Sequence, residues 1–213
     1  GGKGRQAMIA IVDYGSGNVA AIADILKRLK VPHAITRDHA ELRRADRYIL
    51  PGVGAFDRTM RTLEESGLVA VLNEQVIGLR KKILGICVGM QILGDASDEG
   101  SLPGLGWIPG RIKRIDEASI AAPPRLPHMG WNSVRTRVPT PLFKGVDLDQ
   151  GFYFLHSYYF DAADADCVLA TVEYGGEIPC SVGSDNIFGM QFHPEKSQDR
   201  KSTRLNSSHA NIS

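Results

Sequence analysis

Cys87 stands in a sequence context that is typical of a nucleophile. Residues 85–89 read GICVG, between an apolar run and a helix-like run. The pattern glycine, x, nucleophile, x, glycine makes a sharp turn from strand to helix, and the glycines relieve the crowded backbone there. We expect the N-terminus of the helix to favour the thiolate. Lone cysteines are more often small packing residues, which is the role we expect for Cys167 and Cys180.

A base and a carboxylate to orient it occur near the end of the chain. Residues 192–195 read FHPE, so Pro194 places His193 in an extended segment. Alternate side chains of an extended segment point the same way, so Glu195 can fix one tautomer of His193. The other ring nitrogen then takes the thiol proton and returns it to a leaving group. A surface histidine in a turn is the alternative, and the pairing with the Cys87 motif favours catalysis.

Acyl transfer to a thiolate also needs backbone donors for the carbonyl oxygen, which becomes negative. The Val88 N–H directly follows the nucleophile and is one candidate. The other is the Val53 N–H, in a glycine-rich turn (PGVG, 51–54) after an apolar run. Such turns at the carboxyl end of a parallel strand let backbone approach a ligand closely.

The elements that position these groups alternate along the first half of the chain. Buried strands are predicted at 8–12, 34–36, 48–50 and 83–86. Helices are predicted at about 19–29, 40–44, 56–63, 68–79 and 88–93. Alternation of strand and helix predicts a parallel sheet with helices on both faces.

After Gly100 the pattern changes to short extended stretches. They lie at 107–115, 131–137, 152–160, 168–173, 178–183 and 187–192, and we expect them to be antiparallel. The predicted fold is therefore one α/β domain, with a mostly parallel central sheet, helices on both faces and an antiparallel layer in the C-terminal half. We place this domain at residues 8–198, with residues 1–7 as an upstream extension and the polar, aperiodic residues 199–213 as a non-native tail.

Composition narrows the class of protein. The 213 residues carry 25 Lys plus Arg against 24 Asp plus Glu, so the net charge of +1 favours neither nucleic acid nor a membrane surface as partner. Three irregularly spaced cysteines argue against a disulfide framework and a zinc site, and no metal or cofactor is expected. Without a membrane-spanning run or a signal segment, we expect a cytoplasmic protein.

With these pieces in order, the chain resembles the class I (triad-type) glutamine amidotransferases. The family's PGxG, GxCxGxQ and late HPE motifs appear in the same order, over nearly all of residues 8–197. Within the family, the chain is similar to the glutaminase subunits of imidazole glycerol phosphate synthase. The motifs that carry this closer resemblance are DYGSGN (13–18), PHMGWN (127–132), YFLHSYY (153–159) and QFHPEKS (191–197).

The resemblance implies further roles. It assigns the triad to the same three residues, and it implies that glutamine is held by Gly52, Gln91 and the backbone of Ser157 and Tyr158. It also implies a heterodimer with a (β/α)₈-barrel cyclase subunit that receives the ammonia for histidine biosynthesis. The residues that would face this partner are Asn18, Met129, Trp131 and Asn132. A core tryptophan is the alternative for Trp131.

Three other functions stay open on the sequence. One is a glutaminase subunit that serves another synthase, in anthranilate, guanylate or pyridoxal phosphate synthesis, against which the PHMGWN and YFLHSYY motifs argue. Another is a γ-glutamyl hydrolase or peptidase with the same cysteine triad. The third is a regulatory subunit that keeps the fold without catalysis.

Overall fold

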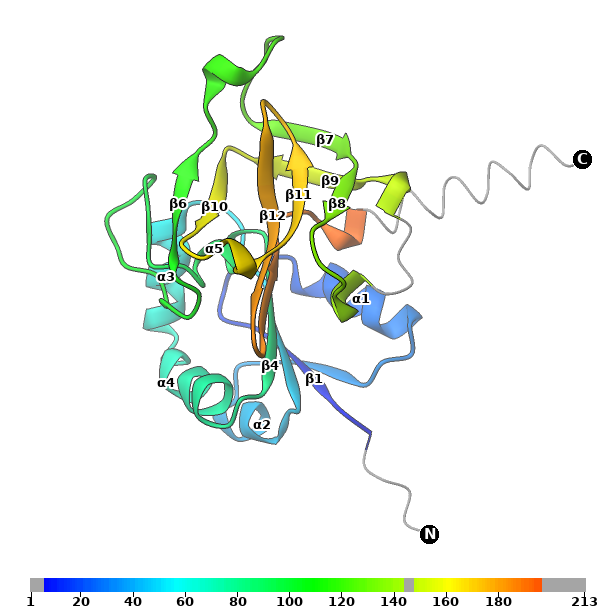
Figure 1. The fold of residues 1–213 in the computed structure, drawn as a ribbon. Coiled ribbons are helices and arrows are strands. Elements are labelled where there is room, and N and C mark those ends of the chain that lie inside the picture. Colours follow the sequence, from blue (N-terminus) through cyan, green and yellow to red (C-terminus); the bar gives the residue numbers. More distant parts are fainter. Residues whose placement is uncertain (1–5, 144–147, 197–213) are drawn as a thin grey trace, which may run out of the picture.

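A computed structural model of the chain describes residues 6–143 and 148–196, and its largest element is a sheet of eight strands (Figure 1). The strand order across this sheet is β2-β1-β3-β4-β13-β12-β11-β8. Both the expected tail, 199–213, and residues 1–5 of the expected upstream extension lie outside the described residues.

Five neighbouring strands form the parallel half of the sheet. They are β1 (Ile9–Val12), β2 (His33–Thr36), β3 (Arg47–Leu50), β4 (Lys82–Ile86) and β13 (Ile187–Met190). The prediction of an antiparallel strand at 187–192 is wrong with respect to β4, because β13 lies parallel to it, with Met190 opposite Ile86. Strand β13 is antiparallel only to β12, from which it follows by a tight turn. As a result, the chain after Met190 leaves the sheet beside the end of β4.

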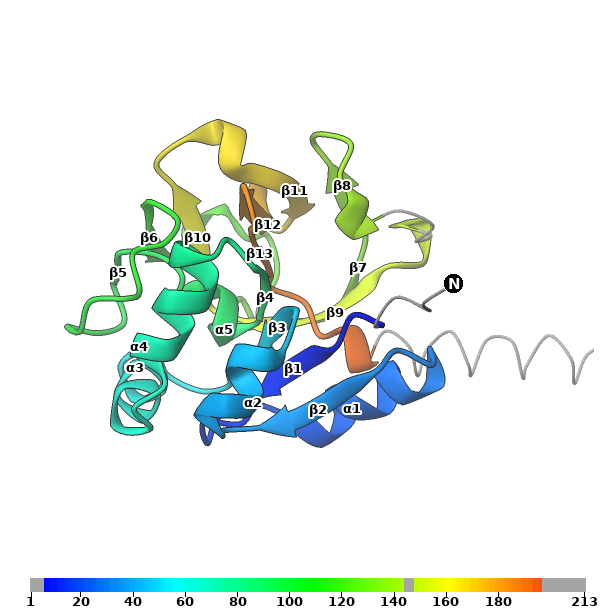
Figure 2. The same cartoon turned by 90° about the horizontal axis from the view of Figure 1, so that it is seen from below.

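Helices cover both faces of the parallel strands, and Figure 2 shows α1 apart from α3 and α4, with β1 and β3 between them. On one face lies α1 (Val19–Arg28). On the other lie α2 (His39–Arg44), α3 (Phe56–Glu65), α4 (Val69–Leu72) and α5 (Val88–Gln91). The helix predicted at 68–79 is two elements, since α4 continues as a π-helix, Asn73–Gly78.

The side chains of β1 show why helices must pack on both faces of the sheet. Ala10 and Val12 belong to the apolar core under α2–α5, whereas Ile11 belongs to the core under α1. Successive strand residues point to opposite faces, so an apolar run is buried only between two layers.

The second half of the chain extends the sheet and adds two small ones. Strands β12 (Glu177–Ser184), β11 (Val168–Glu173) and β8 (Val134–Thr136) continue the central sheet in antiparallel order, and they occupy its upper part in Figure 1. One small sheet holds β10 (Tyr158–Ala162), β6 (Gly110–Arg114) and β5 (Ala96–Ser97), and the other is a ribbon of β7 (His128–Asn132) and β9 (Phe152–His156). Short 3-10 helices lie at Glu117–Ser119, Pro141–Phe143, Leu148–Gln150 and Ala165–Cys167.

Two predicted strands are each divided between sheets. The stretch 131–137 contributes to β7 and β8, and the stretch 152–160 contributes to β9 and β10. The sequence pattern gave no sign of either change of sheet. The second division places Ser157 between two sheets, where its carbonyl accepts a hydrogen bond from the Ile115 N–H at 2.9 Å.

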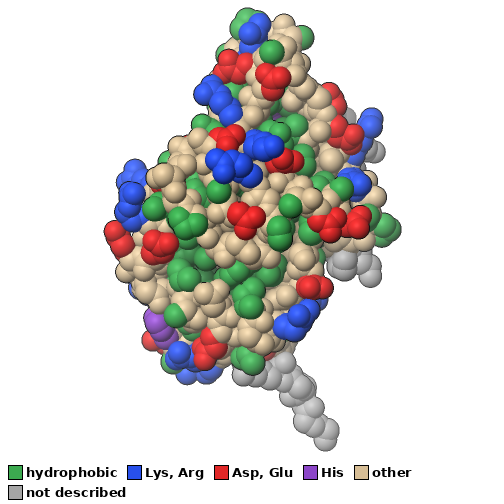
Figure 3. Space-filling view, turned by 60° about the vertical axis from the view of Figure 1, so that its left-hand side comes forward, with side chains coloured by type: hydrophobic (Ala, Val, Ile, Leu, Met, Phe, Trp, Pro, Cys, Tyr) green, Lys and Arg blue, Asp and Glu red, His purple; other side chains and the backbone are tan. Residues whose placement is uncertain are grey.

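The surface carries charges of both signs. On the face in Figure 3, Lys and Arg side chains are interspersed with Asp and Glu, as the net charge of +1 leads one to expect. Within residues 6–143 and 148–196, no helix combines the length and the apolar character needed to cross a membrane.

Candidate active site

Cys87 occupies the turn between β4 and α5 in a conformation that non-glycine residues seldom adopt. Its φ is +58°, and its N–H donates to the Met190 carbonyl at 2.8 Å. The flanking glycines are needed because a Cβ on Gly85 would lie 2.5 Å from the Gly89 carbonyl oxygen. A Cβ on Gly89 would lie 2.0 Å from the Leu50 carbonyl oxygen. Backbone strain of this kind persists only where its surroundings fix it, and here it directs the thiol out of the sheet.

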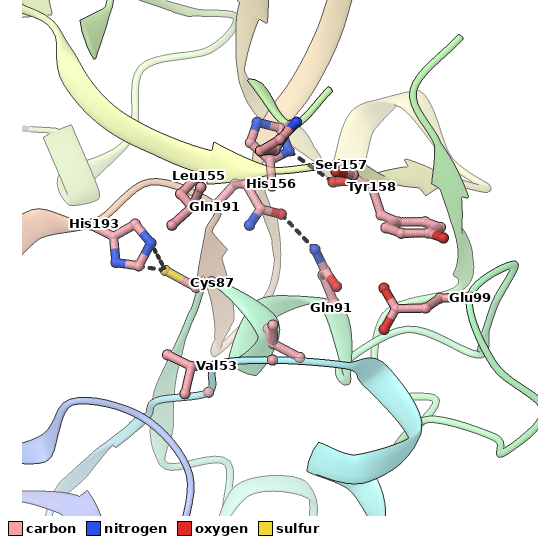
Figure 4. A pocket seen from close by; sticks show the side chains of 14 residues that line it. Val53, Cys87, Gln91, Glu99, Leu155, His156, Ser157, Tyr158, Gln191 and His193 are labelled. Atoms are coloured by element: carbon pink, nitrogen blue, oxygen red, sulfur yellow. Dashed lines mark hydrogen bonds between the residues drawn. The ribbon is translucent and has the colours of Figure 1, made fainter. Parts of the chain in front are cut away.

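The segment after β13 brings a histidine and a carboxylate to this thiol. Cys87 Sγ lies 3.5 Å from each ring nitrogen of His193 (Figure 4). His193 Nδ1 is 3.0 Å from Glu195 Oε1, and the His193 N–H donates to the Tyr153 carbonyl at 2.9 Å. Sequence separation between Cys87 and His193 is 106 residues. Parallel pairing of β13 with β4 brings the two residues close together in space.

The surroundings of Cys87 oppose ionisation of its thiol. Burial raises the pKa of the Cys87 thiol well above its ordinary value, and the Glu195 carboxylate adds to this effect. This effect of burial opposes the stabilisation of the thiolate that we expect from the N-terminus of α5, a helix of four residues. Burial opposes ionisation of Glu195 as well, but its hydrogen bond with His193 and nearby positive charge hold its pKa below the ordinary value. Proton transfer to a histidine is then the route to a reactive thiolate.

A cavity of about 350 Å³ opens beside Cys87. The four residues that the family resemblance implied for glutamine, Gly52, Gln91, Ser157 and Tyr158, all line it. Gln91 is buried, and its Nε2 donates to Gln191 Oε1 at 3.0 Å.

The sequence reasoning missed Glu99, which also lines this cavity. Figure 4 shows Glu99 and His193 at opposite ends of the labelled residues. One Glu99 carboxylate oxygen accepts the Phe56 N–H at 2.8 Å, so the N-terminus of α3 holds this side chain in place. Glu99 lies twelve residues after Cys87 in a polar loop, and no periodicity or motif there indicated a functional residue.

The two predicted oxyanion donors are both engaged within the chain. The Val88 N–H donates to the Gly52 carbonyl at 3.2 Å, and the Val53 N–H donates to Ser16 Oγ at 3.1 Å. The Ser16 hydroxyl in turn donates to the Val53 carbonyl at 3.3 Å. Because the Gly52 carbonyl and the Val53 N–H belong to one peptide unit, a rotation of that unit would release the first donor and redirect the second.

The residues expected to face a partner lie in different environments. Met129 is 63% exposed, and Trp131 is exposed with its ring edge-on to Tyr153 at 5.6 Å. Asn18 is exposed and caps α1 through its side chain. The Asn132 amide points inward and donates to the Glu173 carbonyl at 2.9 Å. Among the described residues, no three His, Cys, Asp or Glu side chains are grouped to hold a metal ion.

Comparison with known proteins decides the family. The family model described as "Glutamine amidotransferase class-I" matches residues 10–210. The chain belongs to this family. One similar amidotransferase is the imidazole glycerol phosphate synthase subunit HisH of Bdellovibrio bacteriovorus, 49% identical over 198 residues that cover 93% of this chain and 97% of that protein. The HisH subunit of Leptospira borgpetersenii is 46% identical over 190 residues, or 89% of this chain and 93% of that protein.

Solved structures have the same amidotransferase fold. A crystal structure of a glutamine amidotransferase superposes with a TM-score of 0.67 at 19% identity, over 92% of this chain and 95% of that one. The structure of PurLQS from Thermotoga maritima gives a TM-score of 0.65 at 19% identity, over 90% of this chain and 89% of that one. At such identities the likeness concerns the fold alone.

Proposed function

We propose that this chain is the glutaminase subunit of an imidazole glycerol phosphate synthase, which hydrolyses glutamine through a Cys87 thioester and passes ammonia to a cyclase subunit. The observation that carries the proposal is the contact of Cys87 with His193, and of His193 with Glu195, at one end of a cavity. Two relatives that are 46–49% identical over most of the chain are HisH subunits of imidazole glycerol phosphate synthase, which supports the choice of synthase.

The chemistry proposed here sets the direction of glutamine in the cavity. Its side-chain amide must reach Cys87, which leaves its α-amino and carboxylate groups toward Gln91 and Glu99, two other residues that line the cavity. The carboxylate of Glu99, an exposed residue that lines the cavity, attracts the α-ammonium group through its opposite charge. Backbone of Ser157 and Tyr158 forms the wall beside the amino-acid end.

The reaction then needs one proton carrier. The Cys87 thiol gives its proton to His193 Nε2 as Sγ attacks the amide carbon, and Glu195 stabilises the imidazolium that forms. The carbon–nitrogen bond breaks, and the same proton converts the leaving NH₂ group to ammonia. A water molecule next gives a proton to His193 and attacks the thioester, so that glutamate leaves and the Cys87 thiol is restored.

Full activity requires the oxyanion donors, and the proposal assigns this step to the Gly52–Val53 peptide. Rotation of this peptide withdraws the Gly52 carbonyl from the Val88 N–H and turns the Val53 N–H toward the cavity. Loss of one such donor lowers the rate of acyl transfer by about 10²–10³. A partner that stabilises the rotated peptide would therefore couple glutamine hydrolysis to its own reaction.

The proposed partner, a (β/α)₈-barrel cyclase subunit, docks over the mouth of the cavity. Leu155 and Val53 are exposed and line the cavity. Two further exposed apolar residues, Met129 and Trp131, lie on β7, where Met129 is opposite Leu155. Aromatic and methionine side chains of this kind are enriched in the centres of interfaces.

Substitution of the nucleophile tests the proposal. In the complex with a cognate cyclase subunit, Cys87→Ala should abolish glutamine-dependent synthesis and leave ammonia-dependent synthesis intact. The matched control is Cys167→Ala, a half-buried cysteine away from the cavity, which should keep both activities. Glutamine-dependent synthesis by Cys87→Ala would refute the mechanism. Hydrolysis of γ-glutamyl peptides in preference to free glutamine would instead favour the peptidase alternative.

A further inference from the structure

Two buried histidines outside the triad contact each other beneath the β7–β9 ribbon. His128 is 4% exposed and His156 is 6% exposed, and His128 Nδ1 lies 2.9 Å from His156 Nε2. The His128 ring is stacked between those of Phe154, at 4.8 Å, and Tyr174, at 4.1 Å. The proposed chemistry makes no use of either imidazole. Buried polar side chains are costly unless they are hydrogen-bonded, so this pair needs an explanation.

The hydrogen bonds of this pair run in one direction. The Tyr158 carbonyl can only accept, so His156 Nδ1, at 2.8 Å from it, must carry a proton and donate. His156 Nε2 then accepts from His128 Nδ1, and His128 Nε2 accepts from the Asn132 amide at 3.3 Å. Burial lowers the pKa of His128 to about 4 and that of His156 to about 3, so both rings are neutral near pH 7. One set of tautomers therefore satisfies the whole chain of hydrogen bonds.

The two ends of this chain lie at different functional surfaces. At one end is β7, which carries His128 and Asn132 inward and presents Met129 outward. At the other end are His156 itself and the next two residues, Ser157 and Tyr158, all of which line the cavity (Figure 4). Three side-chain hydrogen bonds thus run from β7 to this wall of the cavity.

Strand β9 extends the connection to the catalytic base. It carries His156 and pairs with β7 along its whole length. The Tyr153 carbonyl of the same strand accepts the His193 N–H at 2.9 Å, and the Trp131 ring packs on Tyr153. A displacement of the ribbon would thus reach both the amino-acid end and the thiol end of the cavity.

We propose that His128 and His156 are positioning residues, which fix the Ser157–Tyr158 wall of the glutamine cavity to the partner-facing strand β7 through one chain of hydrogen bonds. The inference rests on the proposed function, since the cavity wall matters only if glutamine binds there. It assigns to the ribbon a second role beside contact with the partner, namely control of glutamine affinity.

A matched pair of substitutions at His156 tests this role in the assembled synthase. His156→Asn keeps a side-chain N–H where Nδ1 stands, whereas His156→Leu has a similar apolar bulk and no donor. We expect the leucine variant to raise KM for glutamine about tenfold, the equivalent of one lost hydrogen bond, with kcat within about twofold. The asparagine variant should restore KM to within about threefold of the wild-type value. Ammonia-dependent synthesis should be equal in all three proteins.

A second measurement does not depend on activity. ¹⁵N NMR of the imidazoles should show both histidines protonated at Nδ1 at pH 7, a tautomer that free histidine seldom adopts. Protonation at Nε2 of either ring would overturn the inference, as would an unchanged KM in the leucine variant or equal losses in both variants. A wild-type synthase without glutamine-dependent activity would overturn this inference together with the proposed function, whereas an active wild type with unchanged KM in the variants overturns the inference alone.

Discussion

The buried pair His128 and His156 should make the fold sensitive to mild acid. Histidine has an ordinary pKa of about 6.5, which applies to the unfolded chain. In the folded chain, burial lowers the pKa to about 4 for His128 and about 3 for His156. The unfolded state therefore binds more protons as the pH falls below about 6.5. The stability that the neutral rings contribute is complete above this pH and is lost on acidification toward the folded-state values.

The magnitude follows from these shifts. Between pH 7 and pH 5 both folded rings stay neutral, while an unfolded histidine becomes almost fully charged. On acidification from pH 7 to pH 5, each ring therefore lowers the free energy of unfolding by about 2 kcal/mol, and the pair lowers it by about 4 kcal/mol. A loss of this size is a large part of the roughly 5–15 kcal/mol that stabilises an ordinary domain.

Urea unfolding at the two pH values, with three variants, measures this loss. The double variant His128→Asn/His156→Asn removes both titrations, so its loss of stability on acidification should be smaller than that of the wild type by about 4 kcal/mol. His39→Asn, at the exposed start of α2, serves as the surface control. Equal acid losses in the wild type and the double variant would refute the reasoning. NMR titration gives the direct check, since a pKa near 6 for either buried ring is incompatible with it.

Two further predictions concern the turn that carries Cys87 and the Val53 N–H next to the cavity. Gly89→Ala should prevent folding or abolish activity, because the new Cβ would lie 2.0 Å from the Leu50 carbonyl oxygen. Gly78→Ala is the control for expression and melting temperature, because the nearest atom that its Cβ would meet is 3.9 Å away. Ser16→Ala should raise glutamine turnover in the absence of the partner by about fivefold, because it removes a hydrogen bond of about 1 kcal/mol that holds the Val53 N–H away from the cavity. An unchanged or lower partner-free rate would count against that role of Ser16.

Local patterns in the sequence were enough to predict four of the five strands in the parallel half of the fold. Apolar runs gave β1, β3 and β4 within a residue of their observed bounds, and three- and four-residue spacing gave α1. These signals are local because the period of side-chain burial depends on the backbone of one element. The glycines around Cys87 are local in the same sense, since the turn itself requires them.

Pairing between distant segments had no such signal. The sequence placed 187–192 among antiparallel strands, but β13 lies between β4 and β12 and is parallel to the former. Hydrophobic alternation tells which side of a strand is buried and not which strand lies beside it. For the same reason the changes of sheet within 131–137 and 152–160 were missed.

The residues of the candidate site divide in the same way. By itself the sequence determined the types of group, a cysteine between glycines and a histidine two residues before a glutamate, because a thiol, an imidazole and a carboxylate have fixed chemistry. Only the tertiary structure decided that β13 brings His193 to Cys87, that Glu99 lines the cavity and that Ser16 holds the Val53 N–H. It also decided that the thiol is buried and its pKa raised, since burial depends on the atoms that all other segments of the chain place around a group.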